Sequence, residues 1–161
     1  MTGVRAGLVD LYPLRQGAAG LEALVLRRGP HGRCPGSWEA VHGHVEPGDP
    51  SPAGAALREL AEETGLAAER LYHLSRVDAF WVEAGDTVQL VPAFAAFVTP
   101  AVPVRLSREH DASEWLPLDA AATRCTWPRS ARALADAGRL LAAGHAGTVE
   151  DVLRVPLPVA R

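Results

Sequence analysis

The chain has 161 residues, 48% of them hydrophobic and 22% charged, which is enough to bury the core of one domain. Its net charge of −3 gives no overall basic field, so we expect no nucleic-acid partner. No apolar run approaches the roughly 20 residues of a membrane helix, and the first residues lack the apolar segment of a signal peptide. We therefore expect a cytoplasmic protein without membrane contact, formed by a single domain over residues 1–161, as a monomer or homodimer. Cys34 and Cys125 have no metal-ligand spacing and are expected to be free thiols.

The part of the chain before residue 45 predicts strands joined by a turn and a loop. Alternating apolar residues predict one strand over residues 4–14 and a second over residues 21–28. Residues 29–36 are rich in glycine and proline and indicate a loop. A short strand predicted at residues 37–41 then leads into a glycine turn.

Start and end signals frame a helix over residues 52–64. Ser51 can cap its first turn, and Pro52 suits the first helical position, where a backbone N–H is not needed. Gly65 suits the left-handed position that follows a helix. The sequence therefore predicts one central helix between these residues.

The second half of the chain begins with two predicted strands, over residues 71–81 and 87–98. Pro92 within the second strand indicates an edge position or a bulge, because proline cannot donate to a sheet. Residues 101–111 are expected to contain a short strand followed by a loop. A further strand is predicted at residues 114–118.

Two helices are predicted near the end of the chain, a short one at residues 118–123 and an amphipathic one at residues 128–143. The tail over residues 145–161 has mixed signals, so its structure is left open. Strands lie on both sides of the central helix, and further helices come late. This order indicates an α/β protein whose mixed sheet is covered by helices on both faces.

Three glutamates share one face of the predicted central helix. The spacing of Glu59, Glu62 and Glu63 places them within an arc of about 100°. The opposite side carries Leu57 and Leu60, which suits burial. Gathering carboxylates on a helix costs repulsion. A hard divalent cation would relieve that repulsion through oxygen ligands, and it would suit a phosphate-bearing substrate.

The stretch from Gly43 to Leu66, GHVEPGDPSPAGAALRELAEETGL, resembles the Nudix box. The family pattern is G-x5-E-x7-R-E-U-x-E-E-x-G-U, where U is a bulky aliphatic residue. The segment RELAEETGL matches every specified position of the second half. The first half departs twice, because Asp49 stands where the family usually has glutamate and Pro50 adds one residue before Arg58. The insertion precedes the helix, so the glutamate face is undisturbed.

The resemblance implies the Nudix fold, an α/β/α sandwich around a mixed β-sheet. It also implies a pyrophosphohydrolase that cleaves a nucleoside diphosphate linked to a further moiety, using Mg²⁺ or Mn²⁺. Two other hypotheses are a solvated glutamate-rich helix and a Nudix-fold sensor that binds a nucleotide without turnover. The first does not account for the glycine turn, and the second is disfavoured because all three box glutamates are present.

The same resemblance assigns roles to the residues of the box. Glu59, Glu62 and Glu63 are the expected metal ligands, and the backbone carbonyl of Gly43 is a further candidate. The metal would neutralise phosphate charge, orient the diphosphate and lower the pKa of an attacking water. Arg58 is expected to fix the box by pairing with a carboxylate rather than to contact the substrate.

A general base is also expected, and two glutamates are candidates. In the family this role belongs either to the equivalent of Glu59 or to an acid on a distal loop. Glu109 is the loop candidate, because Glu109, His110 and Trp115 resemble an EH-x4-W segment found in several Nudix hydrolases. His110 itself is expected to be structural.

Substrate contacts are expected from Arg27, Arg28 and Trp38. The two arginines end a strand, and strand alternation sends them to opposite faces, so one can meet a phosphate while the other is solvated. Arg28 is favoured for the phosphate. Several aromatic residues could stack on a base, although core packing is the commoner role for each. They are Trp38, Phe80, Trp81 and Trp127.

The chain also resembles, more loosely, bacterial dihydroneopterin triphosphate pyrophosphatases, which also act on dNTPs. This resemblance rests on the segment SWEAVHGHVEPGD, on the EH-x4-W segment and on Trp127 with Arg129 nearby. A nucleoside or pterin triphosphate is therefore the expected small-molecule substrate. A diadenosine polyphosphate hydrolase is the alternative, although Val41-His42-Gly43 replaces the Pro-Lys-Gly usual there. An ADP-ribose or nucleotide-sugar pyrophosphatase comes third, since residues 1–3 leave no room for the N-terminal segment common in that group.

Overall fold

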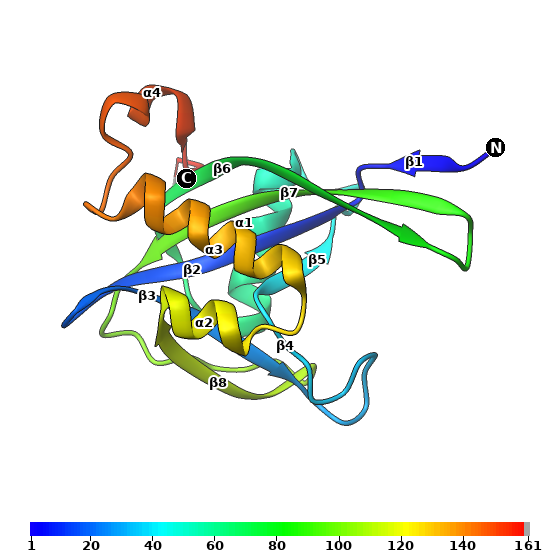
Figure 1. The fold of residues 1–161 in the computed structure, drawn as a ribbon, viewed down its shortest axis with the longest axis horizontal. Helices are drawn as coiled ribbons and strands as arrows, with labels where there is room; N and C mark the ends of the chain where they lie inside the picture. The colour runs from blue at the N-terminus through cyan, green and yellow to red at the C-terminus, as the bar shows by residue number, and fades with distance from the viewer. Residues whose placement is uncertain (160–161) are drawn as a thin grey trace.

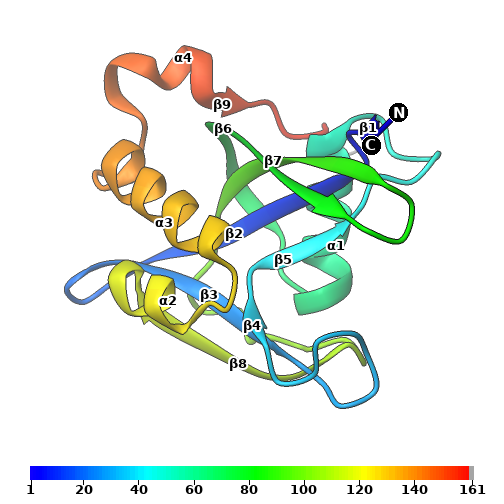
Figure 2. The ribbon, with the colours of Figure 1, turned by 45° about the vertical axis from the view of Figure 1, so that its right-hand side comes forward.

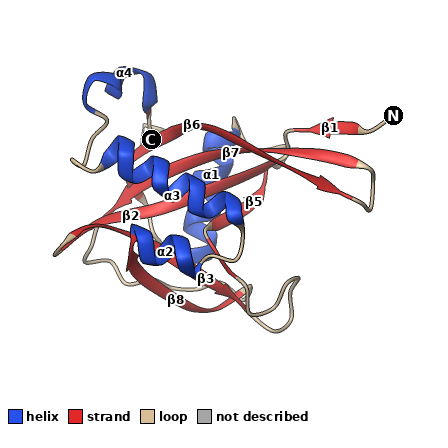
Figure 3. Cartoon of the chain, in the orientation of Figure 1, coloured by secondary structure: helices blue, strands red, loops and turns tan. Residues whose placement is uncertain are grey.

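The computed structural model describes residues 1–159 and shows a mixed β-sheet between layers of helices (Figure 1). Helix α1 lies on one face of the sheet, and α2 and α3 lie on the other (Figure 3). The strands are β1 (Gly3–Arg5), β2 (Leu8–Gly17), β3 (Gly20–Arg28), β4 (Trp38–Glu39), β5 (Val41–His44), β6 (Ala68–Val82), β7 (Thr87–Val98), β8 (His110–Pro117) and β9 (Arg154–Val155). The helices are α1 (Pro52–Thr64), α2 (Leu118–Arg124), α3 (Pro128–Leu141), the 3-10 helix η1 (Gly147–Val149) and α4 (Glu150–Leu153).

Two apolar clusters fill the space between the sheet and its helices. The cluster beneath α1 includes Leu60 of the helix with Leu11 and Phe94 of the sheet. The cluster beneath α2 and α3 includes Leu134 of α3 with Tyr12 of β2. Burial of these side chains on both faces confirms the expected α/β/α sandwich around a mixed sheet.

Strand β2 pairs with two different strands along one of its edges. Residues 14–17 pair with β3 and residues 8–11 pair with β5, both in antiparallel orientation. The opposite edge of β2 pairs with β7 in parallel. Beyond β2, strand β3 continues between β8 and β4. The sheet therefore divides into a β3–β4–β8 branch and a β2–β5 branch, and we call this division the sheet fork (Figure 2).

Helix α1 has the limits that its capping residues predict. The Ser51 Oγ accepts a hydrogen bond from the Gly54 N–H at 3.1 Å, and Pro52 occupies the first turn. Gly65 follows with a φ of 70°, and its N–H donates to the Ala61 carbonyl at 2.9 Å. Both ends of the helix are thus satisfied locally, which fixes the faces that its side chains present.

Pro92 lies inside the sheet, so the edge position considered for it is wrong. Strand β7 is flanked by β6 on one side and by β1 and β2 on the other. The expected bulge is present, because the β6–β7 register shifts next to the pair of Pro92 with Val77. On the other side, pairing with β1 ends at Gln89 and pairing with β2 begins at Ala93. Pro92 therefore occupies a break in the ladder, where its missing N–H costs little.

Two strand predictions need correction. The strand expected over residues 4–14 is divided into β1 and β2, with a break at residues 6 and 7. The short strand expected within residues 101–111 is absent, and β8 begins only at the end of that range. Instead, the Arg105 and Ser107 N–H groups donate to the Thr64 and Glu63 carbonyls of α1 at 2.8 and 3.1 Å. The end of a helix leaves carbonyls without partners, and this loop supplies two of the missing donors.

The tail over residues 145–159 folds back onto the sheet. Strand β9 pairs with β6, and the Tyr72 hydroxyl donates to Glu150 of α4 at 2.8 Å. Residues 160–161 lie outside the described part of the chain. Cys34 and Cys125 are both free thiols, as expected. Within residues 1–159, no helix combines the length and apolar character needed to cross a membrane.

Gly65→Ala is expected to destabilise the protein, because a Cβ is unfavourable in left-handed backbone by about 1–2 kcal/mol. The melting temperature should fall by roughly 2–8 °C for a chain of this size, as measured by scanning calorimetry. Gly48→Ala is the matched control, because Gly48 has no positive φ and an added Cβ there meets nothing within 4 Å. Equal melting temperatures for the two variants would contradict this account of the helix end.

Candidate active site

The three glutamates on the acidic face of α1 differ in their surroundings. Glu62 is exposed, Glu59 is half-buried, and only 4% of Glu63 is exposed. Glu59 packs directly against Gly43 of β5, where an added Cβ would lie 2.1 Å from the Glu59 Cδ. Glycine at position 43 therefore allows the helix and the strand to approach this closely.

Arg58 ties the loop before α1 to the helix. Its Nε and Nη2 each donate to one oxygen of the Asp49 carboxylate at 3.0 Å, and Nη2 also donates to the His44 carbonyl at 2.8 Å. Its Nη1 donates to Glu59 at 2.9 Å and to Glu62 at 3.0 Å. The hydrogen bonds from Arg58 lower the pKa of the Asp49 carboxyl. The shorter acid and the one-residue insertion thus still allow this contact.

Glu63 has the most strongly shifted carboxyl pKa on this helix face. Burial raises the pKa of Glu63 to about 9, and the charges of neighbouring carboxylates add to the effect. Those neighbours are Glu59, Glu39 and Glu109. The Glu63 Oε2 is buried and has no hydrogen-bond partner in the described part of the chain. A buried carboxylate oxygen without a donor favours either a proton or a cation.

The chemistry of this donor set fits a hard divalent cation such as Mg²⁺ or Mn²⁺, which prefers oxygen ligands. Within residues 1–159, however, no three acidic, histidine or cysteine side chains are already arranged to hold a metal ion. Two of the three box glutamates, Glu59 and Glu62, contact the Arg58 guanidinium. A cation would have to draw one of these two away from Arg58, whereas Glu63 already has an oxygen without a partner.

The loop over residues 105–109, anchored on the end of α1, brings Glu109 to the glutamate side. The Glu109 carboxylate is 62% exposed and lies 3.9 Å from the Arg28 Nη2. Its charge contributes to raising the pKa of both Glu59 and Glu63. Residues far apart in the sequence, on β3, on α1 and on this loop, thus gather at one place.

Arg28 is held by Glu39, a buried acid that was not predicted from the sequence. Its Nη1 donates to the Glu39 Oε1 at 2.9 Å, and the same oxygen lies 3.2 Å from the His110 Nε2. Burial alone would raise the pKa of Glu39, but the hydrogen bond from His110 and the charge of Arg28 lower it. The His110 side chain is fully buried, which suits a structural role. An acid between the apolar residues Trp38 and Ala40 was the available signal for Glu39.

Arg27 and Trp38 lie apart from the glutamates, on the sheet face that α2 and α3 cover. Arg27 pairs with Asp111 at 2.7 Å and lies 5.9 Å from the centroid of the Trp38 ring. Trp38 packs against the apolar cluster beneath α2 and α3. Of the three residues expected to contact substrate, only Arg28 is therefore brought beside the box.

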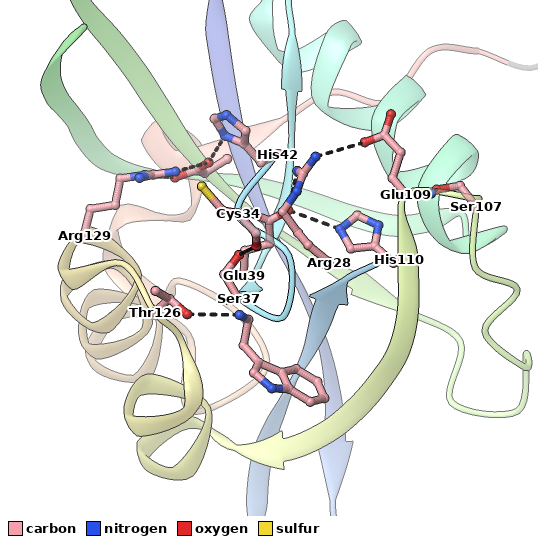
Figure 4. A network of polar contacts seen from close by, with 12 residues as sticks. Arg28, Cys34, Ser37, Glu39, His42, Ser107, Glu109, His110, Thr126 and Arg129 are labelled. Carbon is pink, nitrogen blue, oxygen red and sulfur yellow. Dashed lines mark hydrogen bonds and ion pairs between the residues drawn. The ribbon is translucent and has the colours of Figure 1, made fainter. Parts of the chain in front are cut away.

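A second polar group occupies the β2–β5 branch of the sheet fork (Figure 4). The Asp10 carboxylate is 3% exposed and contacts the His42 Nδ1 at 2.5 Å and the Arg129 Nε at 2.7 Å. Burial alone would raise the pKa of Asp10, but the hydrogen bonds and charges of His42 and Arg129 outweigh it and lower the pKa. The rings of Phe80 and Trp127 lie 5.2 and 5.8 Å from the Arg129 guanidinium carbon. We call Asp10, His42 and Arg129 the Asp10 group.

Two pockets that are partly open to solvent lie away from these residues. One of about 210 Å³ separates the start of α1 from the tail, between Ser51, Leu57, Leu71 and Leu157. The other, of about 30 Å³, lies at the β2–β3 turn beside Leu21 and Pro117. The gathered polar side chains, rather than either of these two pockets, therefore mark the candidate site.

Comparison with known proteins agrees with the geometry. A family model of the NUDIX domain matches residues 2–137. A segment of 103 residues is 44% identical to an octanoyltransferase of Myxococcus xanthus, covering 63% of this chain and 28% of that protein. A segment of 86 residues is 40% identical to the asymmetrical bis(5'-nucleosyl)-tetraphosphatase of Sus scrofa, covering 52% of this chain and 58% of that protein. The chain thus spans less than two thirds of either relative.

Solved structures share the architecture. A C. elegans Ap4A hydrolase in a binary complex superposes with a TM-score of 0.70 at 27% identity, over 84% of this chain and 97% of that chain. The E. coli dihydroneopterin triphosphate pyrophosphohydrolase superposes with a TM-score of 0.65 at 23% identity, over 83% and 95% of the two chains, which is a likeness of fold alone. Because the family model covers most of the sequence, the chain belongs to the Nudix domain family.

Proposed function

We propose that residues 1–161 form one domain that acts as a metal-dependent pyrophosphohydrolase on a nucleoside diphosphate linked to a further moiety. The observation that carries this proposal is the buried Glu63 oxygen without a hydrogen-bond partner, beside Glu59 and Gly43. A cation bridging this helix face and a diphosphate would satisfy that oxygen. Membership of the Nudix family and likeness to the bis(5'-nucleosyl)-tetraphosphatase support the same reaction class.

Glu59, Glu62 and Glu63, with the Gly43 carbonyl, are the residues that would hold Mg²⁺ or Mn²⁺. When bound, the cation would neutralise phosphate charge and lower the pKa of a water molecule. Glu63 can contribute without losing a hydrogen bond, whereas Glu59 or Glu62 must leave Arg58 in order to contribute.

Arg58 acts in this proposal as a positioning residue. It keeps the Asp49 carboxylate and the His44 carbonyl as partners even when the two glutamates turn away. The loop before α1 therefore stays attached to the helix while ligands exchange. Because Nε and Nη2 keep their partners within the protein, we assign Arg58 a structural role and no contact with substrate.

Attack of water on phosphorus forms one P–O bond and breaks the anhydride P–O bond, and a base must accept the proton of the water. We assign this role to Glu109, with Glu59 as the alternative. Glu109 is exposed and borders the glutamate face, so it can reach a water there. Arg28, whose Nη1 donates to Glu39, would contact a substrate phosphate with its Nη2.

Two substrate classes are supported by different observations. The looser sequence resemblance favours a nucleoside or pterin triphosphate, whereas the relative that is 40% identical favours a dinucleoside polyphosphate. A nucleotide-sugar is the third class. Incubation of each compound with Mn²⁺, followed by chromatography of the products, separates these classes. Binding of a nucleotide without any product would instead support a sensor.

Glu63→Gln is expected to remove the response to metal, because it replaces the charged oxygen donor nearest the core. The melting temperature of the wild type should rise with Mg²⁺ or Mn²⁺, as for any ligand that binds only the folded state. That of Glu63→Gln should not, and its turnover should fall at least about a hundredfold. Glu46→Gln, an exposed acid on the loop before α1, is the control. Wild-type turnover and an unchanged metal response in Glu63→Gln would refute the metal assignment.

Asp49→Ala is expected to weaken metal binding without contacting the metal. The Arg58 guanidinium would lose the acid that fixes it and would compete more strongly for Glu59 and Glu62. Loss of such an outer partner costs about 10–100-fold in metal affinity or activity. Titration of the melting temperature with Mn²⁺ measures the affinity, and Asp49→Glu, the residue usual in the family, should restore it. Equal affinities in wild type and Asp49→Ala would show that the Arg58 contact is dispensable.

Glu109→Gln is expected to lower turnover by about 10²–10⁴-fold, the usual contribution of a general base, while leaving the thermal response to metal intact. Glu114→Gln, on β8 and paired with Arg124, is the control. Steady-state kinetics at saturating Mn²⁺ provide the measurement. Unchanged turnover in Glu109→Gln would move the base to Glu59.

A further inference from the structure

The Asp10 group is built like a binding site, yet the proposed chemistry does not use it. Its carboxylate is buried and contacts two basic side chains, His42 through Oδ1 and Arg129 through both oxygens, which holds His42 and Arg129 in fixed positions. It begins one residue from the box, because His42 directly precedes Gly43 on β5. The charge of His42 also helps to lower the pKa of Glu39, so the two branches of the fork lie within electrostatic range.

Only one edge of the Arg129 guanidinium is occupied. Its Nε and Nη2 face Asp10, at 2.7 Å from Oδ2 and 3.5 Å from Oδ1. Among residues 1–159, Asp10 is the one side chain that accepts hydrogen bonds from Arg129. The end of the guanidinium, formed by Nη1 and the outer N–H of Nη2, therefore presents two parallel donors. The Arg129 side chain is 15% exposed, so part of it remains in contact with solvent.

Two aromatic rings border the same guanidinium. Phe80 comes from β6 and Trp127 from the turn before α3, and their centroids lie 5.2 and 5.8 Å from the Arg129 guanidinium carbon. A planar ligand that accepts both free N–H groups must be coplanar with the guanidinium. Such a ligand would extend beside these rings and could stack on them.

Two parallel donors select a base by its acceptors. Guanine presents the acceptors O6 and N7 side by side, and arginine pairs with them in a bidentate fashion. A pterin presents a carbonyl beside a ring nitrogen in the same way. Adenine places an amino donor next to N7, so it would set a donor against a donor. The two free N–H donors of Arg129 thus match fused-ring bases that present two neighbouring acceptors.

We infer that Arg129 is a specificity-determining residue that binds a base carrying a carbonyl beside a ring nitrogen, as in guanine or a pterin, in preference to adenine. The inference rests on the proposed function, because it places the base of the substrate in the β2–β5 branch. Asp10 is the positioning residue that orients the Arg129 guanidinium. The diphosphate would then lie toward Gly43 and Arg28.

Equilibrium binding without catalysis tests this inference. Calorimetry would compare GMP, neopterin monophosphate and AMP, which lack a phosphoanhydride bond, with the wild type, Arg129→Lys and Arg132→Lys. The wild type should bind GMP or neopterin monophosphate about 10–100-fold more tightly than AMP, the range for one bidentate contact. Arg129→Lys keeps the positive charge beside Asp10 but loses the pair of parallel N–H donors, so the preference for GMP or neopterin monophosphate over AMP should disappear. Arg132→Lys, on the same helix and 57% exposed, should keep it.

Equal affinities for the three compounds in the wild type, or an unchanged preference in Arg129→Lys, would overturn the inference, because an arginine that merely ties α3 to β2 shows no base preference. If Arg129→Lys fails to fold, wild-type binding of IMP and 7-deaza-GMP decides. IMP keeps O6 and N7 and should bind like GMP, whereas 7-deaza-GMP lacks N7 and should bind at least fivefold more weakly. The opposite order would overturn the inference. Selective GMP binding without hydrolysis of any nucleotide would overturn the proposed function and leave this inference standing.

Discussion

One guanidinium joins the parts from which the candidate site is made. Arg58 of α1 donates to Asp49 of the preceding loop, to the backbone of β5 at His44, and to Glu59 of its own helix. A loop, a strand and a helix are thus held together by directed, charge-assisted hydrogen bonds from one side chain. The same charge offsets repulsion on the acidic face, so the metal-free protein can keep three carboxylates together.

The sheet fork explains how one small sheet can support two different polar groups. One edge of β2 pairs first with β5 and then, further along, with β3. The two branches therefore lie near each other, although β3 and β5 are not paired with one another. One branch contributes Arg28 and Glu39, and the other contributes Asp10 and His42. Charged residues buried in a continuous sheet would be costly, whereas here each acid is paired with basic side chains. Under the proposed roles, the division of the sheet would separate the residues that handle phosphate from those that recognise a base.

Local signals allowed the central helix and its acidic face to be predicted, because capping and helical spacing act over a few residues. Ser51 and Gly65 mark the limits of α1 as the sequence indicates. The Asp10 group could not be predicted in this way, since its members lie 32 and 119 positions apart in the chain. The strand expected within residues 101–111 failed for the same reason, because that segment bonds to the end of α1 and not to a neighbouring strand. Both the Asp10 group and the structure of residues 101–111 depend on contacts with residues that are distant in the sequence.

Residues 105–109 are attached to the end of α1. The position of Glu109 therefore does not depend on the length of the loop that precedes this attachment. Residues 99–103 before this attachment are exposed and make few bonds, so extra residues there would loop outward. The carboxylate would keep its place beside Arg28, because the anchors lie after the inserted chain. The outer wall of the site can therefore be reshaped in evolution while the distance between the loop acid and the helix glutamates is preserved.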